Sequence, residues 1–321
     1  RYFGASGDLI VGATMNNNPS VQDVWNSAPA WGYNVVPGST GPATAPLFAG
    51  ALAQNVSGLG AYAFWNQMVY AEFSSYRTAN GFWSFMSQGF NVARGNQQIL
   101  KGENPYWRLA LTREWGPHNA MIGTFGLNAK IYPDATNPIG QTNRFRDTGI
   151  DGQYQYILDP HALTLTATYI KEHVDYADSV ANQAHPLDPD GSIGLPLTNS
   201  SDKLRSFRAK AAYSYHAKYG ASVSYFDVSG SSNPALQTSA LDQANPGGLL
   251  SGSQSVTGNL AGNPGTRGWT TEVSWTPVQY ARIGLQYTMF NRFNGASNNY
   301  DGFGRNAKDN NTLFLYLWAA Y

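Results

Sequence analysis

Apolar and polar side chains alternate with a period of two along much of this chain of 321 residues. In the stretch SFRAKAAYSYHAKY, one face carries Phe207, Ala209 and Tyr213. The other face carries Arg208 and Lys210. A period of two places successive side chains on opposite sides of a β-strand, whereas a helix needs a period near 3.6. Helical periodicity is hard to find elsewhere, so the sequence predicts an all-β fold.

The alternation predicts twelve long strands. Strands of roughly 10–14 residues are about twice as long as the usual soluble strand, and they match a tilted membrane strand of ~9–11 residues with a margin. A soluble sandwich or propeller is the alternative, and strands of this length fit it less well. The predicted strands span residues 7–16, 53–65, 67–79, 105–115, 118–131, 144–157, 161–174, 203–217, 219–230, 267–277, 279–291 and 310–321.

Short and long connections alternate between these strands without exception. An up-and-down sheet has this asymmetry when its two ends meet different environments, and outer-membrane barrels have short periplasmic turns and long outer loops. We therefore predict an antiparallel up-and-down transmembrane β-barrel that forms a single domain over residues 1–321. Its short turns lie at Asn66, 116–117, 159–161, 218–220 and 276–279. Its six long outer loops are 17–52, 80–104, 132–143, 175–202, 231–266 and 292–309.

The composition fits a membrane location. Charged residues make up 12% of the chain, and basic and acidic residues balance at 20 each, which excludes the basic surface that nucleic-acid binding needs. The outward faces of the predicted strands hold almost no charge through their middles, as lipid requires. We therefore predict that the protein lies in a bacterial outer membrane, in contact with its lipid and lipopolysaccharide. The aromatic girdle predicted at the strand ends comprises Trp65, Trp107, Trp115, Tyr169, Trp269, Trp275 and Tyr287.

The last segment, NNTLFLYLWAAY, carries no charge and is strongly apolar. In a barrel the last strand must pair with the first, because hydrocarbon cannot satisfy an open edge. This segment is also similar to the C-terminal signal of bacterial outer-membrane proteins, an alternating strand that ends in an aromatic residue. The side chains expected to face lipid are those of Leu313, Leu315, Leu317, Ala319 and Tyr321. Those expected to face the lumen are Phe314, Tyr316, Trp318 and Ala320.

The inward faces of the strands are mixed in charge. A strongly charge-selective channel should carry a ring of one sign, and none is found, so the alternative is that these groups pair across neighbouring strands. Inward aromatic residues suit a lumen that packs against a plug, a cofactor-bearing domain or an apolar solute, although they would also fill a narrow barrel. The predicted lumen-lining residues are Glu72, Arg108, Glu114, Lys130, Asp151, Arg208, Lys210, His216, Glu272 and Arg282. The inward aromatic residues are Tyr62, Phe64, Tyr70, Phe290, Phe314, Tyr316 and Trp318.

Catalytic and metal-binding patterns are missing from the sequence. Neither H-x-x-x-H nor Glu-x-x-His spacing occurs among His118, His161, His173, His185 and His216, and the chain has no G-x-S-x-G. It also has no cysteine, so it forms no disulfide and attaches no c-type haem covalently. We predict that the protein is not an enzyme and that these residues bind no cofactor covalently and no metal.

Several stretches resemble a bacterial family of outer-membrane cytochrome–porin fusions, which includes proteins of iron-oxidising bacteria. The resemblance is carried by residues 12–32, 57–72, 105–116, 123–127 and 285–316, of which the first and last are the most distinctive. It implies a barrel preceded by a small segment with C-x-x-C-H, whose single haem plugs the lumen and conducts electrons to the periplasm.

This resemblance implies more than the chain itself contains. Since cysteine is absent, the haem c would lie on an upstream segment or on a partner, and upstream strands would raise the strand number to about sixteen; otherwise the chain is a barrel-only relative. The leading hypothesis is the insulating sheath of an extracellular electron-transfer conduit, with a c-type cytochrome plug or a periplasmic cytochrome as partner. The alternatives are a passive diffusion porin or solute-specific channel, and an outer-membrane enzyme or adhesin that works through its loops. A homo-oligomer stays open, since trimers are common among porins.

Overall fold

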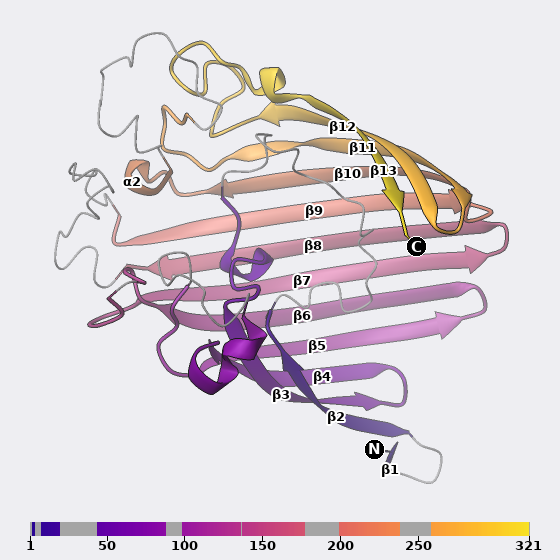
Figure 1. Ribbon diagram of the computed structural model, residues 1–321, viewed down its shortest axis with the longest axis horizontal. Coiled ribbons are helices and arrows are strands. Elements are labelled where there is room, and N and C mark those ends of the chain that lie inside the picture. Colours follow the sequence, from indigo (N-terminus) through magenta and orange to yellow (C-terminus); the bar gives the residue numbers. More distant parts are fainter. Residues whose placement is uncertain are drawn as a thin grey trace.

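A single antiparallel sheet dominates the computed structural model, which describes residues 2–3, 8–19, 44–87, 98–135, 137–176, 199–237 and 258–320 (Figure 1). Each strand pairs with its neighbours in the chain, in the order β1 to β13. The first strand, β1 (Tyr2–Phe3), has two residues, so twelve longer strands form the wall. The predicted class, an all-β antiparallel meander, is confirmed.

Each of the twelve predicted strands is found, and their ends differ from the prediction by a few residues. Strands of the wall pair over nearly their whole length, as β7 and β8 do from Arg144–Asp175 to Leu158–His161. The wall consists of β2 (Leu9–Asn16), β3 (Val56–Trp65), β4 (Val69–Thr78), β5 (Asn104–Trp115), β6 (His118–Ile131), β7 (Asn143–Leu158), β8 (His161–Asp175), β9 (Ser201–Tyr215), β10 (Tyr219–Gly230), β11 (Thr266–Val278), β12 (Ala281–Arg292) and β13 (Thr312–Ala319).

The short turns gather at one end of the sheet, on the right in Figure 1, and the long connections gather at the other. Two of the short turns place both central residues in the left-handed region, Asn66 and Gln67 between β3 and β4, and His216 and Ala217 between β9 and β10. Paired left-handed residues give the turn twist that matches two twisted strands. The short connections therefore lie at one end of the sheet and the long connections at the other, as the sequence predicted.

The long connections contain short helical pieces that the sequence analysis did not predict. These are η1 (Leu47–Ala49), η2 (Gly81–Met86), α2 (Pro234–Gln237) and η4 (Ala307–Asn310). Within the described ranges, no helix is both long and apolar enough to cross a bilayer.

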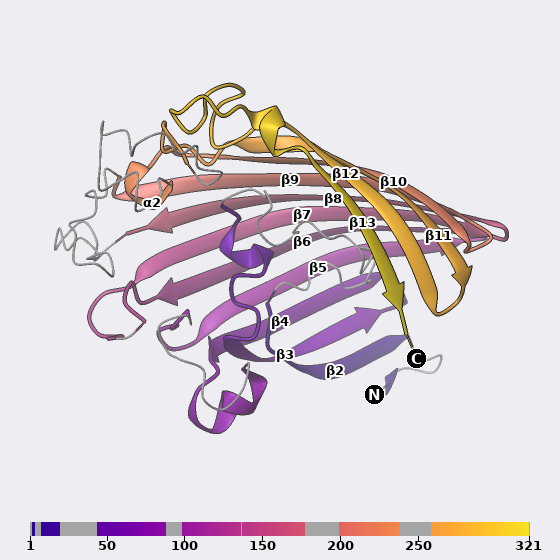
Figure 2. The ribbon, with the colours of Figure 1, turned by 45° about the horizontal axis from the view of Figure 1, so that its top comes forward.

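The sheet is strongly curved, and β13 curls round towards the first strands (Figure 2). In the described strands, β13 pairs only with β12, so the predicted ladder between the last and first strands is not formed and the sheet stays open. Its curvature nevertheless fits a barrel.

The two faces of the sheet differ in the way the alternation predicts. On the convex outer face of β13, the side chains of Leu313, Leu315 and Leu317 are 65–72% exposed, whereas that of Tyr316 on the inner face is 7% exposed. Of the predicted girdle residues, Trp65, Trp107, Trp115, Trp269, Trp275 and Tyr287 are exposed, and Tyr169 is partly exposed. Tyr321 lies outside the described residues.

Aromatic rings on the inner face lie flat over glycines of the neighbouring strand. A Cβ placed on Gly149 of β7 would come within 2.3 Å of the Phe125 ring, and one on Gly284 of β12 within 2.2 Å of the Tyr316 ring. Both pairs are direct register partners across the ladder. A glycine has no side chain to push the ring away, so each ring packs directly on the backbone of the neighbouring strand.

Candidate functional site

A buried charge cluster lies on the inner face of β4, β5 and β7. The Arg108 guanidinium donates from Nη2 to Asp151 Oδ2 at 2.7 Å, and both side chains are almost fully buried. Glu72, the register partner of Arg108, accepts hydrogen bonds from the Tyr70 hydroxyl at 2.7 Å and the Ser74 hydroxyl at 2.9 Å. Each buried charge thus has a partner, which is what a low-dielectric interior requires.

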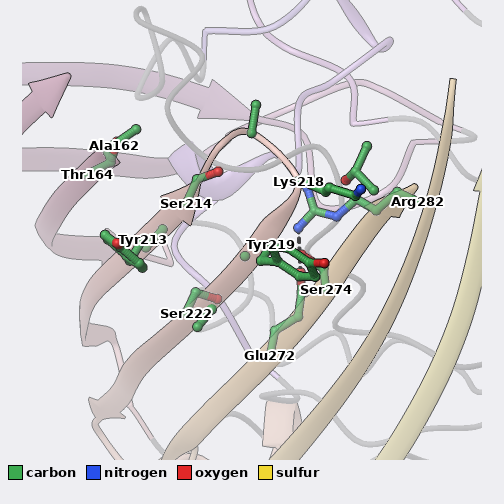
Figure 3. A pocket seen from close by; sticks show the side chains of 15 residues that line it. Ala162, Thr164, Tyr213, Ser214, Lys218, Tyr219, Ser222, Glu272, Ser274 and Arg282 are labelled. Carbon is green, nitrogen blue, oxygen red and sulfur yellow. Dashed lines mark hydrogen bonds and ion pairs between the residues drawn. The ribbon is translucent and has the colours of Figure 1, made fainter. Parts of the chain in front are cut away.

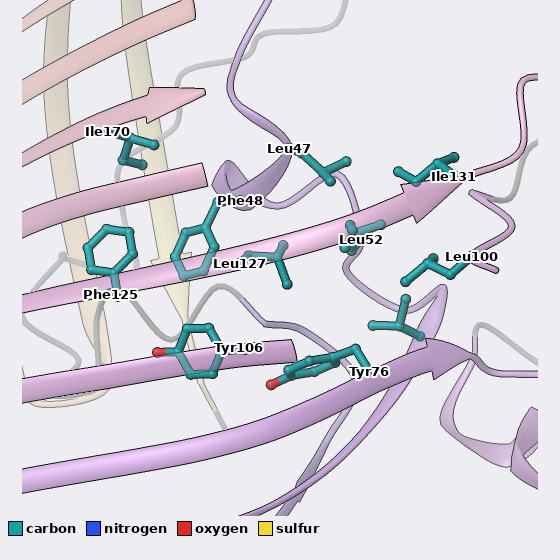
Figure 4. Close-up of a cluster of buried hydrophobic side chains, with 12 residues drawn as sticks. Leu47, Phe48, Leu52, Tyr76, Leu100, Tyr106, Phe125, Leu127, Ile131 and Ile170 are labelled. Atoms are coloured by element: carbon teal, nitrogen blue, oxygen red, sulfur yellow. The ribbon is translucent and has the colours of Figure 1, made fainter. Parts of the chain in front are cut away.

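A segment of the chain itself occupies part of the interior. Residues 44–55, which we call the inserted segment, precede β3 and lie against the concave face of the sheet (Figure 1). Phe48 in η1 is fully buried, and its ring stacks on Phe125 at 4.6 Å and on Tyr106 at 5.7 Å between centroids. The cluster around it, drawn in Figure 4, comprises Leu47, Phe48, Leu52, Val56, Tyr76, Leu100, Tyr106, Phe125, Leu127, Ala129, Ile131 and Ile170.

Two buried acids hold the start of η1. The Leu47 N–H donates to Glu172 Oε2 at 2.6 Å, and the Phe48 N–H donates to Asp147 Oδ2 at 2.8 Å. Asp147 and Glu172 are register partners on β7 and β8, so their carboxyl groups lie side by side. The first N–H groups of a helix have no partner within it, and these carboxyl oxygens satisfy two of them. Packing and hydrogen bonding therefore fix the inserted segment to the same part of the wall.

The acid pair lies beyond the apolar band of the outer face. The outward neighbours Arg146 and Lys171 are charged and exposed, and the apolar outer side chains of β7 begin only at Ile150. Burial raises the pKa of Asp147 above its ordinary value. Burial also raises the pKa of Glu172 above its ordinary value, and the negative charge of Asp147 is the second cause that raises it. The two carboxyl groups therefore share a proton, because two adjacent buried carboxylates repel each other when both are ionised.

The opposite wall, β9 to β13, carries most of the inward cations. Glu272 Oε1 accepts from Arg282 Nη2 at 2.8 Å and from the Tyr316 hydroxyl at 3.0 Å. Arg208 and Lys210 point inward from β9, and no acidic group of the described residues lies within 4 Å of either. These two cations are therefore available to a solute in the lumen.

A hollow of about 180 Å³ opens on this wall near the short turns (Figure 3). Hydroxyl groups and small side chains form most of its lining, with the Glu272–Arg282 ion pair at one side. Such a surface offers hydrogen bonds to water or to a small polar solute. The lining includes Thr164, Ser214, Ser222, Ser274, Glu272 and Arg282.

The structure places most of the predicted lumen-lining residues on the inner face, but two predictions need correction. Lys130 is exposed on the outer face, since Ala129 and Ile131 beside it are the buried inward residues of β6. His216 lies in the β9–β10 turn with a left-handed backbone and not in the wall. The inward residues are Glu72, Arg108, Glu114, Asp151, Arg208, Lys210, Glu272 and Arg282.

The acid pair and the inserted segment were not predicted from the sequence. Asp147 has the same two-residue phase as Asp151, so the alternation contained a signal for its inward orientation. No pattern in residues 17–52 indicated that Phe48 would return into the interior, because a single phenylalanine in a loop has no periodicity to read.

The histidines do not suit a haem or metal inside the lumen. His118 Nδ1 lies 2.8 Å from the Tyr154 hydroxyl on the outer face, and His161 and His173 also occupy outward positions. Across the described ranges, no group of three or more His, Asp or Glu side chains could hold a metal ion. His185 lies outside the described residues. Since the chain also lacks cysteine, its residues do not fit a covalently attached haem c.

Comparison with known proteins leaves the chain without a family assignment. No protein-family model matches it, and no curated protein matches it either.

Proposed function

We propose that the chain closes into a porin-like β-barrel in a bacterial outer membrane and lets small polar solutes diffuse through its lumen. The observation that carries this proposal is the division of one continuous sheet into an exposed face with a broad apolar band and a concave face that carries the buried charged groups. A soluble protein rarely exposes so much contiguous apolar surface, whereas the lipid-facing wall of a barrel must.

The interior supports a narrow passage. The inserted segment fills the space against β4 to β8, and the opposite wall keeps its hydroxyl groups and the cations Arg208 and Lys210 accessible. A solute would pass between an apolar, anchored segment and a polar, positively charged wall. The proposal contains no catalytic step and needs no cofactor.

Single-channel conductance in planar bilayers tests this function. Full-length protein inserted from detergent should give discrete ion-conducting steps. The variant Phe48→Ala loses the ring that stacks on Phe125 and Tyr106, so the inserted segment should leave the wall and the conductance per step should rise. Phe82→Ala is the matched control, because Phe82 in η2 is 83% exposed and should leave the conductance unchanged. Protein that inserts but never conducts ions would contradict the channel.

An electron-transfer conduit is the second candidate. The inward aromatic residues favour it, since the rings of Tyr62 and Tyr70 stack at 5.9 Å and those of Phe314 and Tyr316 at 6.1 Å, which gives apolar surface for a plug. The resemblance to cytochrome–porin fusions is compatible with this role, and the haem would come from another segment or a partner. Haem absorbance in protein purified from its native membrane, together with electron transfer across proteoliposomes, would replace the channel proposal by this one.

A further inference from the structure

Six basic side chains gather on the outer face at the loop end of β6 to β9. They alternate along the strands with buried inward residues such as Asp147 and Glu172, which establishes that they point outward. All six are exposed. This basic outer patch consists of Lys130 of β6, Arg144 and Arg146 of β7, Lys171 of β8, and Lys203 and Arg205 of β9.

Register places like charges directly opposite one another within the patch. Lys130 pairs with Arg144 across β6 and β7, and Lys171 pairs with Arg205 across β8 and β9. Directly opposed like charges destabilise a sheet, so two such pairs in one small area cost stability unless an anion covers them.

Acidic groups on the same face are too few to neutralise the patch. Asp175 accepts from Arg146 Nη2 at 2.6 Å and lies 3.0 Å from His173 Nε2. Asp227, on β10, accepts from the Tyr225 hydroxyl at 3.3 Å. Among the described residues, no acidic group lies within 4 Å of the other five cations, Lys130, Arg144, Lys171, Lys203 and Arg205.

The patch adjoins the apolar outer band. Ile150 on β7 and Phe207 on β9 are 57% and 37% exposed, and they follow the basic residues towards the short turns. The Lys171 ammonium lies 5.6 Å from the centre of the Tyr169 ring, which connects the two regions. A ligand that covers both regions must have anionic groups and hydrocarbon chains in one molecule.

We propose that the basic outer patch binds the phosphate groups of a phosphorylated membrane amphiphile, the lipid A part of lipopolysaccharide in the outer leaflet. Arginine forks bind phosphate oxygens in pairs, and strands about 4.8 Å apart place cations of neighbouring strands within reach of one phosphorylated headgroup. Its acyl chains then lie along the apolar side chains of β7 to β9. The inference rests on the proposed outer-membrane location and names the lipid partner of that wall.

Lipid binding to full-length protein in a zwitterionic detergent tests the patch. Bisphosphorylated lipid A should bind more tightly than the same lipid with its phosphates removed, and the double variant Lys171→Gln/Arg205→Gln should weaken binding of the phosphorylated form on the order of 30-fold. Arg113→Gln/Lys308→Gln is the matched control, because it removes two exposed cations outside the patch. This control should bind like the unchanged protein.

Several outcomes would overturn the proposal. Equal binding of the phosphorylated and dephosphorylated lipids would show that acyl chains alone are recognised. Full competition by millimolar inorganic phosphate would show a site for the free ion and not for a lipid. Equal weakening by the control variant would show that only total charge matters. Any of these results in protein that still conducts ions would reject the lipid site and leave the channel intact, whereas protein that neither inserts nor conducts would reject both.

Discussion

Arg208 and Lys210 are the inward cations that no acid of the described residues approaches within salt-bridge distance. We expect Arg208→Gln/Lys210→Gln to shift the permeability of the channel towards cations. A unit charge at about 4 Å in water contributes about 1 kcal/mol, so losing one cation should lower anion permeability about fivefold and raise cation permeability about fivefold. The ratio of anion to cation permeability should therefore fall about 30-fold for each charge. Reversal potentials in a salt gradient measure the ratio. Arg113→Gln, which removes an outward cation, should leave it unchanged, and an equal change in this control would reject the assignment.

Ala217 in the β9–β10 turn has a φ of 52°, a conformation that costs an alanine energy and a glycine almost none. We expect Ala217→Gly to raise the free energy of unfolding by about 1 kcal/mol. Urea titration of the protein in detergent or lipid vesicles measures this difference. Ala162→Gly, in the regular backbone of β8, should instead lower the stability. A stability loss at Ala217 would contradict the left-handed turn.

The inserted segment should respond to pH through the acid pair. In the docked state burial raises the pKa values of Asp147 and Glu172, and this outweighs the opposite effect of the hydrogen bonds from the Phe48 and Leu47 N–H groups. Undocking exposes both acids to water, so the docked state binds protons more tightly than the undocked state. The stabilisation of the docked state by these protons is therefore complete below the ordinary carboxyl range of about pH 4, and it declines as the pH rises through the raised pKa values. We expect the conductance per step to increase from acidic to alkaline pH. Asp147→Asn/Glu172→Gln keeps the oxygen acceptors and should abolish the dependence; a dependence that persists would assign it elsewhere.

Packing of Phe48 should supply most of the docking energy. A buried Phe→Ala change typically costs about 3–5 kcal/mol, and Phe48 is fully buried against Phe125 and Tyr106. Gly149→Ala should act in the same direction without touching Phe48, because its new Cβ displaces the Phe125 ring. Hydrogen exchange at the Leu47 and Phe48 amides measures the opening of the segment. Unchanged protection in both variants would show that the ring contacts do not hold it.

The elements of the wall were predictable because side chains in a strand repeat every two residues, and the lengths of the connections reported the two ends of the sheet. The inward positions of Arg108, Asp151 and Glu272 followed from the same phase. Lys130 was assigned to the wrong face because β6 also buries apolar Leu127 and Ile131 inward, which inverts the usual rule that apolar residues face lipid. Contacts between a loop and the wall, such as those of Phe48, depend on the folded shape and leave no local pattern.

At the scale of the whole molecule, the apolar outer face can lie in lipid only if the sheet closes. An open edge in hydrocarbon leaves backbone groups without hydrogen-bond partners. β2 and β13 run antiparallel to each other in an up-and-down meander of this length. The short β1 covers the β2 edge only at Leu9 and Ile10, so the edge beyond them is compatible with β13. The low charge of the chain, its long strands and its asymmetric ends all agree with one closed wall.

Disulfide cross-linking across the seam tests closure most directly, because the chain has no cysteine of its own. Leu315→Cys on β13 would be combined in turn with a cysteine at the outward positions Val11, Ala13 and Met15 of β2, in protein folded into lipid vesicles and oxidised. A disulfide requires Cα atoms within about 7 Å, so a closed barrel predicts a cross-link for one of these pairs. The register partners Leu315→Cys and Leu285→Cys are the positive control. A control that cross-links while no seam pair does would contradict the barrel.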